Sequence, residues 1–268
     1  MTKKHIGDEI KVVICDPVPR DTRPDYYQWK IDYLKTVARP EVKIDYVCLP
    51  AGKGYFDVPT TPYQHAVNSP AIAEQAYIAE KRGYDAFILG GVCDYKNEIR
   101  ALVDIPVIHP MESAYYLASM MGDKFSIICD AHHWFSKFEA QMQLWGIQNK
   151  CGSMRHPAKL DAFDDSWEWM KPERHAEFTA IIREEMAKAV KEDRAEALIM
   201  GFTVAGTVLA MQGLHEVDGA PVIDPMTAAI KMAEIMVDLQ RTTDLKVCRN
   251  SIYEGPTNGW EKVHPIHY

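Results

Sequence analysis

Carboxylate and imidazole side chains follow two short runs of Val and Ile in this chain, and both kinds of group can move protons. Asp16 ends the first run and Asp130 ends the second, and His132 and His133 follow Asp130 after a single alanine. A carboxylate withdrawn from water has its pKa raised towards neutrality, where histidine already titrates. These residues predict acid–base catalysis, with at most one of the two adjacent histidines at work. Capping of the following helix is the structural alternative for either aspartate.

A cysteine in a glycine-rich turn is another candidate for proton transfer. Cys93 lies in the segment GGVCDY, where a helix amino terminus would lower the pKa of an exposed thiol. The alternative is a buried and inert cysteine. Backbone N–H groups near Gly91, Val92 and Thr203 would hold a carboxylate or a developing enolate oxygen. The predicted catalytic residues are thus Cys93, Asp16, Asp130 and His132.

A metal site is a weaker hypothesis. His109, Asp16, Asp130 and one histidine of the pair are of the types that bind zinc or manganese. They come from separate loops and show no spacing typical of a metal site. The prediction therefore contains neither a metal nor another cofactor.

The segments that position these residues occur twice in the chain. The matched pairs, in the same order in both halves, are VVICDP and SIICDA, DAFILGG and EALIMGF, and VDIPVIHPMESA and VDGAPVIDPMTAA. Their offset is nearly constant, which indicates an internal duplication of a unit of about 110 residues. Two equivalent units would place matched positions on opposite walls of a shared cleft.

Strands and helices alternate in each copy, which is typical of parallel sheets covered by helices. Buried strands are predicted at 10–15, 86–89, 106–108, 125–129, 197–200 and 221–223. Helices are predicted at 97–102, from Pro172, and from Pro70 with Ser69 as the N-cap. The stretch 161–169 is expected to be a surface connection, and the tail after residue 242 an irregular segment.

The predicted fold class is therefore α/β, with two pseudo-symmetric, flavodoxin-like domains and an active site in the cleft between them. The first domain would comprise residues 1–112 and 226–268, and the second residues 113–225. In parallel sheets ligands bind beyond the carboxyl ends of the strands, where all the candidate residues stand.

Composition limits the partners of the chain. The net charge of −8 argues against nucleic acid and anionic membranes as partners. The amino terminus has no apolar segment typical of a secretory signal, and the longest apolar run, 197–211, is too short to span a bilayer. The expected location is cytoplasmic, and the six cysteines are expected to be reduced and mostly buried.

The repeated segments resemble the aspartate/glutamate/hydantoin racemase superfamily. The resemblance runs from ICDP through DAFILGG, RALVDIPVIHPMESA and ALIMGFT to GAPVIDPMTAAIKMAE, and its last part is closest to the hydantoin racemase branch. It implies two pseudo-symmetric α/β domains, catalysis without a cofactor, and frequent assembly of relatives into homo-oligomers. It also implies a pair of cysteines, of which one removes a proton next to a carbonyl and the other returns one to the opposite face.

The chain departs from that pattern at both cysteine positions. The first position falls on Gly91 and the second on Phe202, whereas Cys93 stands two residues beyond the first. Asp16 and Asp130 occupy positions where the family usually has Asn or Thr. These differences indicate that acid–base work moved from thiols to carboxylate and imidazole.

The predicted function is that of a cofactor-independent racemase or isomerase. It would act by one-sided proton transfer next to a carboxylate or cyclic amide carbonyl of a small molecule. The alternatives are a hydrolase that opens a lactam or hydantoin-like ring with an Asp/His cluster, with or without a metal, a decarboxylase or lyase, and a binding protein without chemistry. Helix capping is the alternative role for Asp224. The predicted substrate-binding residues are Gly91, Val92, Glu112, His133, Phe202, Thr203 and Asp224.

Overall fold

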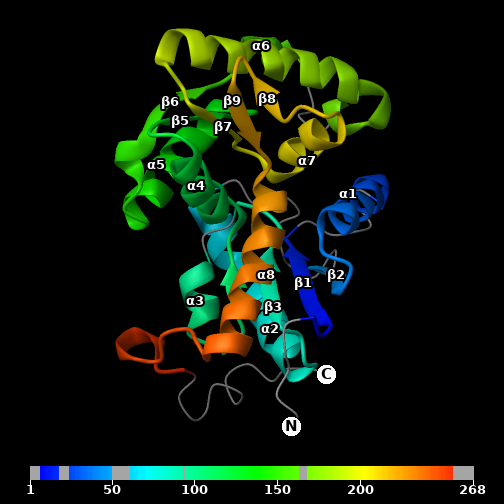
Figure 1. Ribbon diagram of the computed structural model, residues 1–268, viewed down its shortest axis with the longest axis vertical. Coiled ribbons are helices and arrows are strands. Elements are labelled where there is room, and N and C mark those ends of the chain that lie inside the picture. Colours follow the sequence, from blue (N-terminus) through cyan, green and yellow to red (C-terminus); the bar gives the residue numbers. More distant parts are fainter. Residues whose placement is uncertain (1–6, 18–23, 50–60, 93–94, 163–167, 256–268) are drawn as a thin grey trace. The chain divides into compact units, whose positions relative to one another are not determined.

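The computed structural model describes residues 7–17, 24–49, 61–92, 95–162 and 168–255 (Figure 1). The predicted catalytic residue Cys93 lies outside these ranges. The chain divides into two compact units, Met1–His109 with Ile230–Tyr268, and Pro110–Ala229. Each unit contains a parallel sheet with helices, so the predicted α/β class is confirmed.

The first unit has a four-stranded parallel sheet in the order β2-β1-β3-β4. Its strands are β1 (Ile10–Asp16), β2 (Val42–Cys48), β3 (Ala86–Leu89) and β4 (Val107–Ile108). The four residues of β3 are all buried, as expected for a strand covered on both faces. The carboxyl ends of β1 and β3 meet where Cys15 pairs with Leu89, which places Asp16 next to the turn at Gly90.

The helices of the first unit are α1 (Pro24–Val37), α2 (Pro62–Lys81) and α3 (Lys96–Arg100), together with most of α8 (Pro225–Thr243), from Ile230 onward. The predicted N-cap at Ser69 is wrong, because Pro70 lies inside α2. The helix starts instead at a capping box, in which Thr61 and Gln64 satisfy each other's backbone N–H groups. Burial of Ile72 and the residues around it against the core continues the helix past the proline.

The second unit has a five-stranded sheet in the order β6-β5-β7-β9-β8, in which only β8 runs antiparallel to its neighbour among the described strands. Its strands are β5 (Phe125–Ile128), β6 (Cys151–Arg155), β7 (Ala197–Met200), β8 (Glu216–Val217) and β9 (Ala220–Ile223). Its helices are α4 (Pro110–Met121), α5 (Phe135–Leu144), α6 (His175–Asp193), α7 (Thr203–Met211) and the start of α8. Short 3₁₀ turns lie at η2 (His132–Trp134) and η4 (Ala158–Ala162).

The end of the predicted surface connection is part of the core. Trp169 is only 2% exposed, and its ring stacks on Phe178 of α6 with 3.9 Å between the centroids. The prediction that Trp169 lies on the surface is therefore wrong. Burial of its large apolar ring against α6 stabilises the folded protein more than exposure to water would. Residues 163–167 lie outside the described part of the chain.

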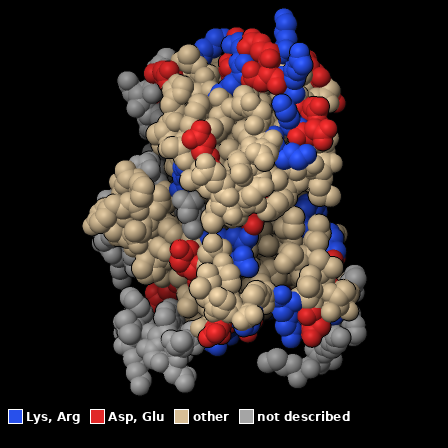
Figure 2. Space-filling model, turned by 90° about the vertical axis from the view of Figure 1, so that its left-hand side faces the viewer, with Lys and Arg blue, Asp and Glu red and all other residues tan. Residues whose placement is uncertain are grey.

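The surface over α6 carries charges of both signs (Figure 2). Lys188 pairs with Glu184 and Glu185, and Arg155 of β6 pairs with Glu185 and Asp193. None of the helices in the described ranges has the length and apolarity needed to cross a membrane. The cysteines that the structure describes are free thiols, namely Cys15, Cys48, Cys129, Cys151 and Cys248.

Candidate active site

Asp130 stands at the carboxyl end of β5 and is the least compensated carboxylate of the second unit's strand ends. It is buried, with 9% of its surface exposed, and its Oδ1 atom has no hydrogen-bond partner within the described structure. Burial raises its pKa from the ordinary value of 3.8 to about 7, whereas nearby backbone N–H groups and His156 oppose that rise. A carboxyl with this pKa can both accept and donate a proton near neutral pH.

The thiol beside Asp130 is not a candidate for the same work. Cys129 is fully buried, and burial and the charge of Asp130 hold its pKa well above the ordinary value. It therefore stays protonated, which agrees with its predicted place in the core.

The two predicted histidines differ in their surroundings. Both lie on the short η2 turn and are exposed. His132 has its ring centroid 4.5 Å from that of His156. The His133 ring lies 4.6 Å from that of Trp134, and desolvation lowers the pKa of His133.

His156 belongs to this group and was not predicted. It follows β6, and its side chain is 2% exposed. Its Nδ1 atom lies 3.2 Å from the Cys129 carbonyl oxygen and its Nε2 atom 2.7 Å from Asp161 Oδ1. The strand before it was missed because CGSMR is a half-exposed edge strand without an apolar run. The sequence signal that remained was a His-Pro pair near the acidic segment at 161.

Phe202 and Thr203 begin α7 at the carboxyl end of β7. The Phe202 ring packs edge-on against Trp169 with 6.1 Å between centroids, and Thr203 is 1% exposed. Phe202 thus offers an apolar surface and no titratable group at the position where the resemblance noted above would place the second cysteine. The first turn of α7 directs backbone N–H groups towards this strand end, as oxyanion binding requires.

Asp224 caps α8. Its Oδ1 atom accepts from the Met226 N–H at 3.1 Å, and its Oδ2 atom accepts from the N–H of Thr227 at 3.1 Å and its hydroxyl at 2.7 Å. A Cβ atom at Gly206 would lie 2.7 Å from Asp224 Oδ1, so the absent side chain leaves room for the cap. This is the capping role given above as the alternative to substrate binding.

We expect replacement of Asp224 with Ala to lower the free energy of unfolding by about 1–2 kcal/mol, because the first N–H groups of α8 lose their acceptor. Urea denaturation measures the change. The exposed Asp123, replaced in the same way, serves as the control and should shift stability by less than about 0.5 kcal/mol. Full stability of the Asp224 variant together with a raised KM would instead assign this carboxylate to the substrate.

Asp16 is part of a buried ion pair in the first unit. Its Oδ2 atom accepts from the Tyr46 hydroxyl at 2.7 Å and from Lys30 Nζ at 3.3 Å. Lys30 has no exposed surface and also donates to the Gly90 carbonyl oxygen at 3.3 Å. A Cβ atom at Gly90 would lie 2.7 Å from the Asp16 Cα atom, so glycine allows this close approach. Neither Lys30 nor Tyr46 was predicted.

The other predicted residues lie around the strand ends of their own units. Gly91 is half-buried, Val92 is buried, and His109 is fully buried after β4. Glu112 is half-buried in the first turn of α4. His132 lies with its ring 4.5 Å from that of His156, which contacts the carbonyl oxygen of Cys129, the residue before Asp130. Asp16 has partners of its own, Tyr46 and Lys30. No cluster of three or more metal-binding side chains occurs among the described residues.

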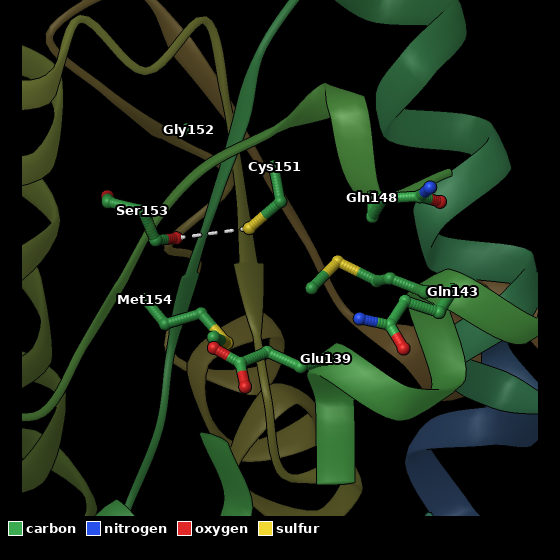
Figure 3. Close-up of a pocket in the computed structure, with 8 residues that line it drawn as sticks. Glu139, Gln143, Gln148, Cys151, Gly152, Ser153 and Met154 are labelled. Carbon is green, nitrogen blue, oxygen red and sulfur yellow. Dashed lines mark hydrogen bonds between the residues drawn. The ribbon is translucent and has the colours of Figure 1, made fainter. Parts of the chain in front are cut away.

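A separate pocket of about 330 Å³ lies between α5 and the edge strand β6 (Figure 3). Its lining contains none of the predicted residues and consists of Glu139, Met142, Gln143, Gln148, Cys151, Gly152, Ser153 and Met154. The Cys151 thiol donates to the Ser153 carbonyl oxygen at 3.4 Å, and burial raises its pKa to about 11. Such a thiol is protonated at neutral pH and is a poor nucleophile.

Known proteins resemble this chain along most of its length. The profile of the Asp/Glu/hydantoin racemase family matches residues 25–233. A hydantoin racemase of Pseudomonas sp. (strain NS671) is 30% identical over 215 residues, which are 79% of this chain and 81% of the relative. The solved allantoin racemase of Klebsiella pneumoniae has a TM-score of 0.78 at 21% identity and covers 93% of this chain and 95% of its own.

A second solved structure, allantoin racemase of Pseudomonas fluorescens, has a TM-score of 0.74 at 20% identity over 92% of this chain and 97% of its own. At these identities the solved structures establish the fold, and the sequence matches establish the relationship. Together they support the predicted racemase, whereas the hydrolase, decarboxylase and lyase alternatives find no support. The strand-end carboxylates therefore stand in a racemase fold, and the chain belongs to the Asp/Glu/hydantoin racemase family.

Proposed function

We propose that this racemase-family enzyme moves the proton on the ring carbon of a hydantoin-like cyclic amide, with Asp130 as the acid–base group. The observation that carries the proposal is the state of that carboxyl. It is buried, one oxygen has no partner in the described structure, and its pKa is raised to about 7. A general base works best when its pKa lies near the operating pH.

The substrate class rests on the relatives. The matched relatives are named hydantoin racemase and allantoin racemase, and both names denote substrates with a hydantoin ring. In such a ring the reacting carbon stands next to a carbonyl. When a base takes its proton, the electron pair of the C–H bond moves to the carbonyl oxygen and forms an enolate. Backbone N–H groups at Thr203 are the proposed contacts for that oxygen.

In the proposed reaction an acid–base side chain acts on one face of the reacting carbon and not on the other. Gly91 and Phe202 replace the two thiols of the family pattern, and neither side chain can exchange a proton. Cys93 lies outside the described residues and stays a predicted catalytic residue. His132 lies within the described residues, and its catalytic role also stays a prediction. A proton that Asp130 removes and returns goes back to the same face, which exchanges the hydrogen without inverting the carbon.

Solvent deuterium tests this function. With one enantiomer of 5-methylhydantoin in D₂O at pH 7, we expect deuterium to enter the ring carbon faster than the optical rotation decays. Proton NMR follows the exchange and polarimetry follows the inversion. Equal rates of exchange and inversion would contradict the one-sided reaction, and no exchange with 5-methylhydantoin or allantoin would contradict the function. A sample without enzyme gives the background exchange.

The assignment of domains to residues 1–112 with 226–268 and 113–225, the cytoplasmic location and the assembly into a homo-oligomer stay predictions. The substrate contacts of Gly91, Val92, Glu112, His133 and Phe202 have the same standing.

A further inference from the structure

Lys30 of α1 holds the turn that follows β3. Its side chain has no exposed surface, and its Nζ atom lies 3.3 Å from the Gly90 carbonyl oxygen, to which it donates, and 3.3 Å from Asp16 Oδ2. The Gly90 N–H donates to the Cys15 carbonyl oxygen of β1 at 2.7 Å. Both backbone groups of Gly90 are therefore bonded, one to the neighbouring strand and the other to a buried side chain.

The hydrogen bond from Lys30 fixes a whole peptide group. The Gly90 carbonyl and the Gly91 N–H belong to one planar unit, and no cis peptide bond occurs in the described ranges. In a trans unit the carbonyl and the N–H point in opposite directions, so the Gly91 N–H points away from the buried amino group. This N–H has no hydrogen-bond acceptor among the described residues. It is thus a donor with a fixed direction in a half-buried residue.

Lys30 is itself held in place. Its Nζ atom lies 5.4 Å from the centroid of the Tyr46 ring, and the Tyr46 hydroxyl donates to the same Asp16 oxygen at 2.7 Å. Tyr27, three residues before Lys30 in α1, is fully buried and packs edge-on against Tyr46 with 5.3 Å between ring centroids. Because packed interiors leave a buried side chain few alternative rotamers, the contact with Gly90 keeps one orientation.

We propose that Lys30 is a positioning residue, which orients the Gly91 N–H as a donor to the substrate oxygen that gains negative charge in the reaction. Gly91 follows the carboxyl end of β3, where ligands of parallel sheets bind. A hydrogen bond at the carbonyl also polarises the peptide and makes its N–H a stronger donor. Donors that are oriented beforehand stabilise an enolate oxygen without rearranging during the reaction. The inference rests on the proposed function.

The sequence allows this peptide to be observed on its own. Gly90 and Gly91 are the only two adjacent glycines in the chain, so labelling with [1-¹³C,¹⁵N]glycine gives a single coupled ¹³C–¹⁵N peptide signal. We expect Lys30→Met to move the carbonyl carbon of this signal upfield, because the lost hydrogen bond no longer draws electron density from it. Triple-resonance NMR measures the shift.

Turnover is the second readout. For deuterium exchange into 5-methylhydantoin, kcat and kcat/KM of Lys30→Met should fall by the same factor, about ten- to a hundredfold, since the donor acts in the transition state. Lys35→Met, at an exposed position of the same helix, should change neither the coupled signal nor turnover. Tyr46→Phe removes another donor to Asp16, and it should lower stability while the coupled signal keeps its position.

A coupled signal at its wild-type position in Lys30→Met would overturn the inference, and an unchanged kcat would do the same. If Lys30→Met does not fold, the double variant with Asp16→Asn removes both charges of the pair, and an unmoved signal there has the same meaning. Failure of the wild-type enzyme to exchange 5-methylhydantoin or allantoin would contradict the proposed function, whereas the coupled signal would still decide whether Lys30 orients the peptide. The two failures can therefore be told apart.

Discussion

Replacing Asp130 with Asn should make the protein more stable at pH 8 and nearly inactive. The carboxyl is buried, and its pKa is raised from 3.8 to about 7 in the folded protein. As pH rises from about 4 to 7, the unfolded chain ionises this group while the folded protein does not. Stability is therefore lost across that window, and above it the ionised carboxylate costs up to about 4 kcal/mol. Asn carries no charge and escapes the cost.

The same replacement removes the acid–base group. Because a positioned acid or base contributes about a hundred- to ten-thousand-fold to the rate, kcat should fall by a factor in that range. Urea denaturation at pH 4, 6 and 8 gives the stability difference, which should be near zero at pH 4 and largest at pH 8. Asp123→Asn, at an exposed position, should leave both properties unchanged. An Asp130 variant that is less stable than the wild type at every pH would show that the carboxylate is structural.

When a replacement raises stability and lowers activity, the original residue serves catalysis rather than folding. A buried charge without a full set of partners is costly, and folded proteins rarely keep one without a function. The predicted role of Asp130 came from its position after an apolar strand, and the structure shows it buried just after β5, while the role itself stays a prediction. The raised pKa of Asp130 could not be predicted, because it results from burial by residues that are distant in the sequence.

Much of the fold could be predicted from apolar runs and their repetition. The strands at 86–89 and 197–200 have the predicted bounds, because their residues are buried on both faces and form continuous apolar segments. The edge strand β6 could not be predicted in this way, since its residues are half-exposed and include Gly152. The start of α2 was missed because the sequence offers two possible starts, one at Pro62 and one at Pro70. Only tertiary packing selects the first of them.

The same limit applies to the site. His156 follows the missed strand, so its contact with the carbonyl oxygen of Cys129, the residue before Asp130, could not be inferred. Lys30 is wholly buried in α1, where a lysine would ordinarily be expected at the surface. Lys30 is buried because Asp16 and the Gly90 carbonyl oxygen, which lie on other elements, satisfy its ammonium group, and one ring nitrogen of His156 contacts the Cys129 carbonyl oxygen after β5. A pattern of residue types along one chain does not contain that information.

The buried pair of Lys30 and Asp16 leads to the second large effect. Lys30→Met should lower the free energy of unfolding by about 3–5 kcal/mol, because it leaves Asp16 buried without its cation. The Tyr46 hydroxyl, 2.7 Å from Asp16 Oδ2, would remain as a neutral donor and cannot replace the charge. The carbonyl oxygen of Gly90 would lose a donor as well. Urea denaturation at pH 7 measures the loss.

The double variant Lys30→Met with Asp16→Asn separates the pair from its parts. Removing both charges should recover much of the stability, since a neutral buried pair has no uncompensated ion. The exposed Lys35 of α1, replaced with Met, controls for the loss of a surface charge and should cost less than about 0.5 kcal/mol. A double variant as unstable as the single one would show that Lys30 acts through packing. A stable double variant without turnover would show that Asp16 takes part in the reaction. A stable double variant that retains turnover would support Asp130 as the catalytic carboxylate.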